Sequence, residues 1–396
     1  MLRLERERSG RGAFHIFEVL LFFERYVCYN KSFTKKQKGD PPDMLGKREL
    51  NLGFDILRIL SAFSVVMLHV SGVFIEISKV GSIDFRLANF LNSISRFGVP
   101  IFVMISGAIF LSEDKKISIK KIWLNNILRM LIVFGVWSFA YYVFQSLYFW
   151  NFDFWRQGIV RTIVGCVYAS EHFWFVFMII GLYALVPILR TWVHHATKKE
   201  LDYFVILFVV FQIGRTTLTT LVDKSLVVKI ADMLKIFELS WYLGYFVLGY
   251  ILVKYGVSAR LKKVLWVMIP VGIVANYFIS DYMSLKKGVY SPGIYDSFGV
   301  FTFLHAVALF VLCQDFFAKR KKEGLAGKIC TNLALDTLGI YMMHVGLLEF
   351  FESERFIIGS MNPALGSVLL SFICFGVCAI VAALLRRIPF VGKYLC

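Results

Sequence analysis

Arg58 and His69 are the two residues of the first long apolar run whose chemistry stands out. They lie eleven positions apart between Leu52 and Ile75. Eleven steps of about 100° bring both side chains to one face of a helix, within about 20° of each other. A charged residue at bilayer depth costs roughly 2.5–3.5 kcal/mol, so it usually faces the interior of a helix bundle and marks a functional site. In the alternative interpretation, Arg58 only extends to the cytoplasmic surface and His69 is a hydrogen-bonded helix contact.

The composition indicates a membrane protein. Of the 396 residues, 58% are hydrophobic and 17% are aromatic, which is more apolar surface than a soluble domain can bury. The formal charge of +17 would suggest a nucleic-acid partner in a soluble protein. Here the basic residues lie between apolar runs, where they orient the chain in the lipid bilayer, so no nucleic-acid partner is expected. The cysteines form no C-x-x-C pair and no metal-like spacing with histidine, so we expect neither a disulfide framework nor a metal site.

Apolar runs of about 20 residues predict about ten membrane-spanning helices. They lie at 52–75, 87–111, 122–149, 173–190, 201–221, 236–253, 263–280, 297–318, 330–351 and 363–385. One set of connections carries twenty-one Lys and Arg residues and the other carries ten. The positive-inside rule therefore places both termini in the cytoplasm. The predicted fold class is an all-α polytopic membrane helix bundle, with one membrane domain over residues 51–396.

Residues 1–50 form a basic N-terminal extension with no clear structural pattern. Its apolar patch, 14–23, is too short to span a membrane and is not followed by a signal-peptide cleavage pattern. Met44 begins a compact basic lead into the first span. We therefore expect translation to start at Met44; otherwise the extension is a disordered cytoplasmic tail.

Polar side chains from several spans reach the outer level of the predicted bundle. His69 lies about 17 residues, or roughly 25 Å, from the inner end of its span, and His344 lies about 15 residues from the inner end of the ninth span. Arg96 enters with the second span from outside, and His172 ends the outer connection before the fourth span. A single intramembrane histidine is usually a helix contact. Three histidines and one arginine at one depth instead predict a polar site.

A second basic group lies on the cytoplasmic side. Lys120 and Lys121 precede the third span, which contains Arg129 about two turns inside. The positive-inside rule alone also explains the lysines. Arg129 lies within the span and, together with Arg58, is placed to meet an anionic ligand that enters from the cytoplasm. A phosphate-rich acyl carrier such as coenzyme A fits that polarity.

Five segments together resemble the acyltransferase 3 family of multi-pass membrane acyltransferases, particularly the bacterial enzymes that O-acetylate surface polysaccharides. The likeness runs from residue 52 to about 390. The segments are FDILRILSAFSVVMLH, in which Arg58 and His69 occupy the family's Arg-x10-His pattern, RFGVPIFVMISG, HFWFVFMIIGLY, WYLGYFVLGY and LGIYMMH. The resemblance implies a protein of the bacterial plasma (inner) membrane that moves an acyl group, usually acetyl from cytoplasmic acetyl-CoA, to a sugar hydroxyl at the outer face. Two departures are the N-terminal extension and the lack of the family's fused soluble esterase-like domain.

Acyl transfer to a hydroxyl needs a base, hydrogen-bond donors for the oxyanion and a cavity that excludes water. We assign His69 as general base, because an imidazole accepts a proton near neutrality. Arg58 would orient the thioester or phosphate, and Arg96 would serve the acceptor pocket or the oxyanion. The further acceptor-side candidates are His172, Trp174, Tyr341 and His344. The acyl-CoA-binding candidates are Arg58, Lys120, Lys121 and Arg129.

Alternatives to this assignment follow from the same residues. Direct transfer and a transient acyl-histidine are both compatible with the pattern. The rival function is a transporter or exporter of a glycan or small anion, because broken helices and midplane charges also bind transported substrates. A silent membrane scaffold is disfavoured by the cost of polar residues at this depth. The sequence does not fix an oligomeric state.

Overall fold

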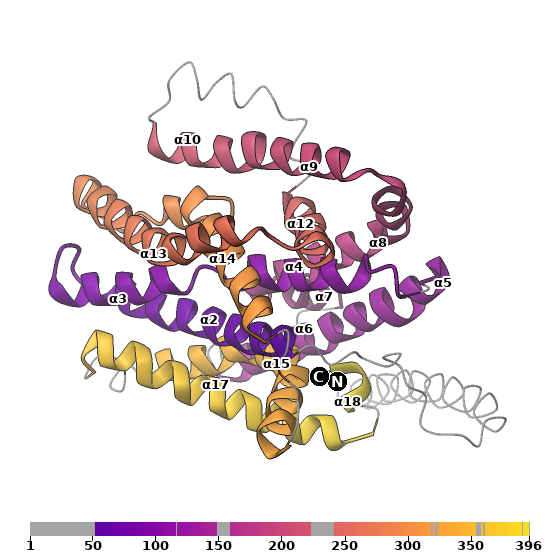
Figure 1. Cartoon of the computed structure of the whole chain (residues 1–396). Coiled ribbons are helices and arrows are strands. Elements are labelled where there is room, and N and C mark those ends of the chain that lie inside the picture. Colours follow the sequence, from indigo (N-terminus) through magenta and orange to yellow (C-terminus); the bar gives the residue numbers. More distant parts are fainter. Residues whose placement is uncertain are drawn as a thin grey trace, which may run out of the picture. The chain divides into compact units, whose positions relative to one another are not determined.

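The computed structural model describes residues 52–115, 117–148, 159–222, 241–317, 320, 324–353, 358, 361–389 and 391–395. Every regular element in these ranges is a helix (Figure 1). The all-α prediction is therefore confirmed. The predicted N-terminal extension, residues 1–50, lies outside the described residues.

Nine helical segments within the described ranges are long and apolar enough to cross a membrane. They run over Leu52–Ile77, Ile83–Phe110, Ile119–Leu147, Glu171–His195, Lys198–Leu221, Ala259–Lys287, Gly293–Phe317, Gly324–Ser353 and Pro363–Arg387. Nine of the ten predicted spans coincide with them. The remaining predicted span, 236–253, is described from residue 241 onward as part of α12, Trp241–Tyr255. The chain is thus a multi-pass membrane helix bundle.

Four of these nine segments are each one continuous helix, and the other five join two or three shorter elements. The long helices are α2 (Leu52–Ile77), α6 (Leu128–Tyr148), α8 (Trp174–His195), α13 (Ala259–Lys287), α14 (Val300–Phe317), α15 (Gly324–Ser353) and α17 (Pro363–Arg387). The shorter ones are α3 (Ile83–Ile94), α4 (Gly98–Phe110), α5 (Ile119–Lys121), α7 (Ile159–Val167), α9 (Lys198–Leu207), α10 (Arg215–Leu221) and α18 (Val391–Leu395). Two π-helical segments, η1 (Ile122–Ile127) and η4 (Phe208–Gly214), and two 3-10 turns, η3 (Glu171–Phe173) and η6 (Gly293–Tyr295), join them.

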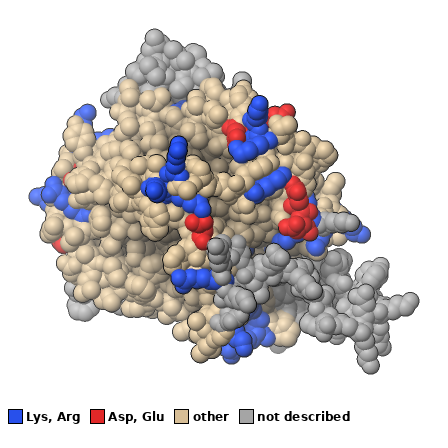
Figure 2. Space-filling model, in the orientation of Figure 1, with Lys and Arg blue, Asp and Glu red and all other residues tan. Residues whose placement is uncertain are grey.

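Helix α17 shows why these helices suit a lipid environment. Its exposed face carries large apolar side chains, including Phe372 and Ile380, which are 61% and 64% exposed. Its buried face carries small or weakly polar residues such as Ser367, Ser371 and Cys374. Lipid solvates the large apolar side chains, whereas small residues allow helices to approach closely. On the face shown in Figure 2, charged side chains likewise gather in a few groups and leave wide areas without charge.

Helix α2, which carries Arg58 and His69, is the central element of the bundle. It packs against α3, α4, α15 and α17, and it lies between α3 and α17 in Figure 1. Its buried face contains Ser61, Ala62 and Ser64, which leave room for close neighbours. A Cβ on Gly98, at the start of α4, would lie 2.4 Å from the Ser64 hydroxyl. The two helices are therefore in near-backbone contact.

The predicted second span is broken between α3 and α4. Helix α3 ends at Ile94, a turn covers 95–97, and α4 starts at Gly98 with Pro100 in its first turn. Proline lacks an amide hydrogen and clashes with the preceding turn, so a helix tends to restart there. The break places Arg96 in the turn between two half-helices rather than on a continuous helix face.

Candidate active site

A cavity of about 470 Å³ lies beside the C-terminal half of α2. Its lining includes His69 of α2, Asn92 of α3, Arg96 of the α3–α4 turn, His172 of η3 and Glu349 of α15. Four parts of the chain thus contribute to one hollow: α2, the end of α3 with its following turn, η3 and α15. We call this hollow the histidine cavity.

Three imidazole rings cluster beside this cavity. The ring centroids of His69 and His344 are 5.1 Å apart, and those of His172 and His344 are 5.3 Å apart. The side chains of His172 and His344 are buried, whereas His69 is half-buried and lines the cavity. Within the described part of the chain, His69 has a ring contact with His344 and an electrostatic contact with Arg96 but no hydrogen bond. Its imidazole is therefore available to a bound molecule.

The hydrogen bond of His344 fixes its tautomer. Its Nδ1 lies 2.6 Å from the backbone oxygen of Tyr341. A carbonyl only accepts, so Nδ1 carries the proton and donates it. In the neutral ring Nε2 is then the acceptor, and this buried atom meets no hydrogen-bond partner among the described residues. His344 consequently presents a lone pair rather than an N–H at its Nε2.

Tyr341 holds the histidine cluster together without lining the cavity. Its hydroxyl donates to the backbone oxygen of His172 at 2.6 Å. Its ring centroid lies 5.5 Å from that of His172 and 5.6 Å from that of His344. The hydroxyl of Tyr141 on α6 donates to the backbone oxygen of Met342 at 2.9 Å and supports the same turn of α15. These contacts fix the position of η3 relative to α15.

Arg96 is held by polar and aromatic groups instead of a carboxylate. Its Nη2 donates to Asn92 Oδ1 and, at 3.3 Å, to the Tyr290 hydroxyl. Its guanidinium lies 4.4 Å from the ring centroid of Tyr295. Burial raises the pKa of Tyr290 more than the neighbouring guanidinium lowers it, so the phenol stays neutral. Among the described residues no carboxylate forms an ion pair with Arg96, so no direct partner neutralises its positive charge.

Several cavity residues were not singled out by the sequence argument. Glu76, Glu349 and Glu352 all line the cavity, as does Asn92. The sequence holds a signal for Glu76, because it follows His69 by seven positions, and seven residues return to the same helix face. Glu349 and Glu352 lie on α15, whose relation to α2 is set only by packing. No spacing rule joins residues on different helices.

The predicted donor-side residues lie in two different places. Arg58 is separated from His69 by eleven residues of α2, or roughly 16 Å, and pairs with Asp55 at 3.3 Å. Arg58 and Arg129 both lie within electrostatic range of Tyr183 on α8. The structure thus brings these two arginines toward one region of the bundle. Lys120 and Lys121 in α5 are exposed instead.

Trp174 does not line the histidine cavity. It is 45% exposed, and its ring lies 5.6 Å from that of Tyr242 on α12. This position is typical of an aromatic residue at the membrane interface. His305 does not line the cavity either: its buried ring packs against Phe97.

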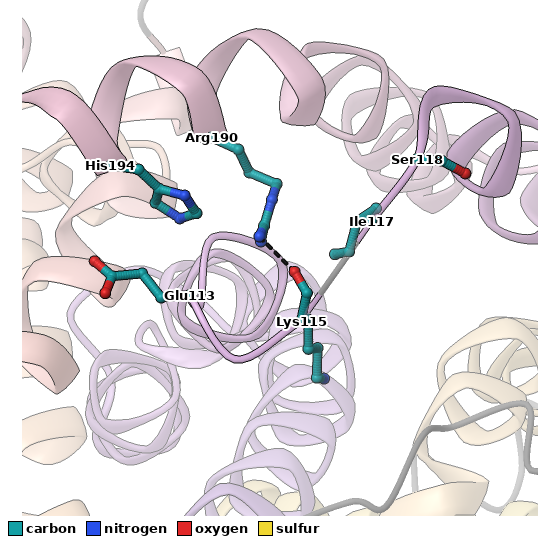
Figure 3. A pocket seen from close by; sticks show the side chains of 6 residues that line it. All are labelled: Glu113, Lys115, Ile117, Ser118, Arg190 and His194. Carbon is teal, nitrogen blue, oxygen red and sulfur yellow. Dashed lines mark hydrogen bonds between the residues drawn. The ribbon is translucent and has the colours of Figure 1, made fainter.

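A second hollow, of about 440 Å³, is lined by residues of the α4–α5 connection and the C-terminal end of α8 (Figure 3). Its side chains Arg190 and His194 bind backbone oxygens. Arg190 donates to the backbone oxygens of Phe110, Ser112 and Lys115, and His194 Nε2 lies 2.8 Å from that of Leu111. Figure 3 shows Arg190 reaching toward the Lys115 carbonyl. These groups satisfy carbonyls just beyond the C-terminal end of α4, where basic side chains are favoured.

The acid in this second hollow is paired as well. Glu113 accepts from Lys254, and their side-chain atoms are 2.6 Å apart. That hydrogen bond and the lysine charge hold the pKa of Glu113 below its ordinary value. Because its charged groups bind each other and the backbone, we interpret this hollow as structural. Within the described residues, no group of three or more histidine, cysteine or acidic side chains is arranged to hold a metal ion.

Comparison with known families decides the class of protein. The family model described as the acyltransferase domain, acyltransferase 3, matches residues 51–386. The chain belongs to the acyltransferase 3 family. It is accordingly a membrane acyltransferase, and the resemblance drawn from the five sequence segments is confirmed at the family level. Comparisons with curated proteins and with solved structures gave no match.

Proposed function

We propose that this acyltransferase 3 protein moves an acetyl group from cytoplasmic acetyl-CoA to a hydroxyl of a cell-surface polysaccharide or lipid-linked sugar at the bacterial plasma membrane. The observation that carries the proposal is the His69 imidazole, which faces the histidine cavity without a hydrogen bond to any described residue. A polar group kept available at this depth in a membrane span is costly unless it is used.

In the proposed reaction, His69 takes the proton of the acceptor hydroxyl. The hydroxyl oxygen attacks the thioester carbonyl, the carbon–sulfur bond breaks, and the proton passes to the departing thiolate. General-base assistance of this kind contributes roughly 100- to 10,000-fold to a rate. Arg96 is suited to stabilise the oxyanion, because a guanidinium stays charged and this one has no carboxylate partner among the described residues.

The donor would approach from the opposite end of α2. Arg58 and Arg129 lie in that direction, roughly 16 Å along the helix from His69. Guanidinium groups bind phosphate oxygens well. An extended pantetheine arm would then carry the thioester from these arginines toward His69. Two separated polar regions thus fit a donor and an acceptor that come from opposite sides.

Transfer of radiolabelled acetyl-CoA tests the proposal. The purified protein in lipid nanodiscs, supplied with cell-envelope glycan of a strain lacking the gene, should label the glycan. His69→Ala should reduce labelling by about 100- to 10,000-fold. His305→Gln is the matched control, because it alters a buried membrane histidine outside the cavity, and it should retain activity. Substrate flux in sealed vesicles without any label transfer would overturn the proposal and favour a transporter.

A further inference from the structure

The histidine cavity has more acidic than basic side chains in its lining. Four carboxylates line it, and Arg96 is the basic side chain of the described lining that opposes them. Four carboxylates against one guanidinium leave a formal charge of −3 when the histidines are neutral. The carboxylates belong to Glu76, Glu171, Glu349 and Glu352.

One of the four carboxylates, that of Glu349, is held by a hydrogen bond, whereas Glu76, Glu171 and Glu352 are exposed. Glu349 is half-buried, and Gln145 Nε2 on α6 lies 3.2 and 3.1 Å from its two oxygens. The same amide nitrogen lies 2.9 Å from the Ala169 backbone oxygen. Glu352 is electrostatically coupled to Glu76 and Glu349. An uncharged amide therefore positions the half-buried carboxyl group of Glu349, and no basic side chain forms an ion pair with it among the described residues.

A second observation independently points to a ligand with hydrogen-bonding groups. His172 lines the cavity and is 4% exposed. Its Nδ1 contacts the Ser170 hydroxyl at 2.5 Å, while its buried Nε2 has no hydrogen-bond partner among the described residues. The Met342 carbonyl lies near this ring and accepts from Tyr141 at 2.9 Å, but no hydrogen bond joins it to Nε2. A buried polar atom of this kind is costly unless a bound molecule satisfies it.

We propose that the histidine cavity accepts a sugar ring that is neutral or carries an amino group, and that it rejects sugars with an acid group. Glu349 is the specificity-determining residue, because its positioned carboxylate can accept from two hydroxyls or from an ammonium but not from another carboxylate. This inference rests on the proposed function and names the acceptor class of the same site. The ring of Tyr168, which is 81% exposed and lies in the lining, provides a flat surface for the sugar.

The expected discrimination follows from like-charge repulsion. Two carboxylates about 7 Å apart repel each other substantially at the effective dielectric constant of a protein surface, and dissolved salt reduces the effect. We expect an acidic sugar to bind about tenfold more weakly than its neutral counterpart. The difference should shrink as salt concentration rises, which separates charge repulsion from a steric cause.

Ligand-observed NMR titration of the full chain in neutral nanodiscs tests this inference. The probes are methyl glucoside, methyl glucuronide and methyl glucosaminide, three rings of one skeleton with charges of 0, −1 and +1. The glucoside and glucosaminide should bind about tenfold more tightly than the glucuronide. Equal or tighter binding of the glucuronide would overturn the proposal, and so would binding of none of the three probes.

Variants then assign the discrimination to the carboxylates. Glu349→Gln should lower the ratio of the affinity for the glucoside to that for the glucuronide. The triple change of Glu76, Glu349 and Glu352 to Gln should bring this affinity ratio close to one. Glu113→Gln removes a carboxylate of the second hollow and should leave the ratio unchanged. A triple variant that folds and keeps the wild-type ratio would refute the role of these residues.

Acetyl transfer and probe binding, both measured on the wild-type protein, separate this inference from the proposed function. Intact discrimination without any acetyl transfer by the wild-type protein would overturn the proposed reaction but retain the charge selection. Acetyl transfer to a glycan, together with glucuronide binding as tight as that of the glucoside, would overturn the charge selection but retain the proposed reaction.

Discussion

The imidazole of His69 on α2 lies against that of His344 on α15, with ring centroids 5.1 Å apart and ring planes inclined by 52°. The two residues are 275 positions apart in the sequence. Because His344 donates its Nδ1 proton to the Tyr341 carbonyl, its lone pair is at Nε2. The proposed base is thus paired with a second imidazole whose proton is held at the opposite side of its ring.

The first prediction concerns the Nε2 atom of His344. If it acts as an acceptor in the site, His344→Gln should retain more activity than His344→Asn, because the glutamine amide reaches the position of Nε2. The asparagine amide instead mimics the Nδ1 donor to Tyr341. We expect His344→Asn to lower kcat about 100-fold with little change in KM. Initial-rate kinetics of acetyl transfer on both variants provide the measurement.

A purely structural role for His344 predicts the reverse order. His344→Asn would then be the better substitute, because it preserves the hydrogen bond to the Tyr341 carbonyl. Thermal unfolding of both variants in nanodiscs controls for this possibility. Equal loss of kcat and of thermal stability in the two variants would contradict an acceptor role.

The second prediction concerns Arg58 and Arg129. Loss of a charge-assisted hydrogen bond costs about 1.5–3 kcal/mol, so Arg58→Ala and Arg129→Ala should each raise KM for acetyl-CoA about tenfold or more. Arg260→Ala alters an exposed residue outside the donor-side candidates and should change KM about twofold at most. Varying acetyl-CoA at a fixed acceptor concentration measures both effects. An unchanged KM in the two arginine variants would remove these residues from the donor site.

Much of the fold could be predicted from the sequence because the bilayer imposes one rule on every span. Apolar length alone identified nine segments that the structure describes as helices capable of crossing a membrane. The same rule missed the turn at 95–97, because the length of an apolar run is the same for one continuous helix and for two half-helices joined by a turn. Pro100 was the available signal, and its effect depends on contacts of α4 with α2 that spacing does not reveal.

The part of the candidate site that depends on depth in the membrane was predictable, because the rise per residue of a helix gives the depth of each side chain. The rise placed His69 and His344 at one level, and their rings are in contact. It did not predict the glutamates of α15, because depth says nothing about the direction in which a side chain points. Trp174 shows the same limit. It lies at nearly the same depth as His172, but its ring packs against Tyr242 and does not line the cavity. Side-chain direction is set by tertiary packing.

The third prediction concerns Arg190, whose guanidinium binds three backbone oxygens near the end of α4. Arg190→Ala leaves these carbonyls without their donors and should lower the free energy of unfolding by about 2 kcal/mol. Arg190→Lys should retain only part of the lost free energy of unfolding, because an ammonium lacks the planar set of N–H donors of the guanidinium. Arg260→Ala, at an exposed position of α13, is the control. A melting temperature of Arg190→Ala equal to that of the control would contradict the clamp, as would a selective rise in KM for acetyl-CoA.

The fourth prediction concerns the contact between α4 and α12. A Cβ on Gly107 would lie 1.7 Å from the Phe246 backbone oxygen, and a Cβ on Gly249 would lie 2.0 Å from that of Met104. These are backbone atoms, so only a separation of the helices can relieve the clash. Gly107→Ala should therefore destabilise the protein by about 3 kcal/mol. Gly135→Ala, whose Cβ would meet no atom within 4 Å, should be neutral or slightly stabilising because alanine favours the helix. Unfolding in a denaturing detergent measures both, and a Gly107→Ala variant as stable as Gly135→Ala would contradict the close packing of these helices.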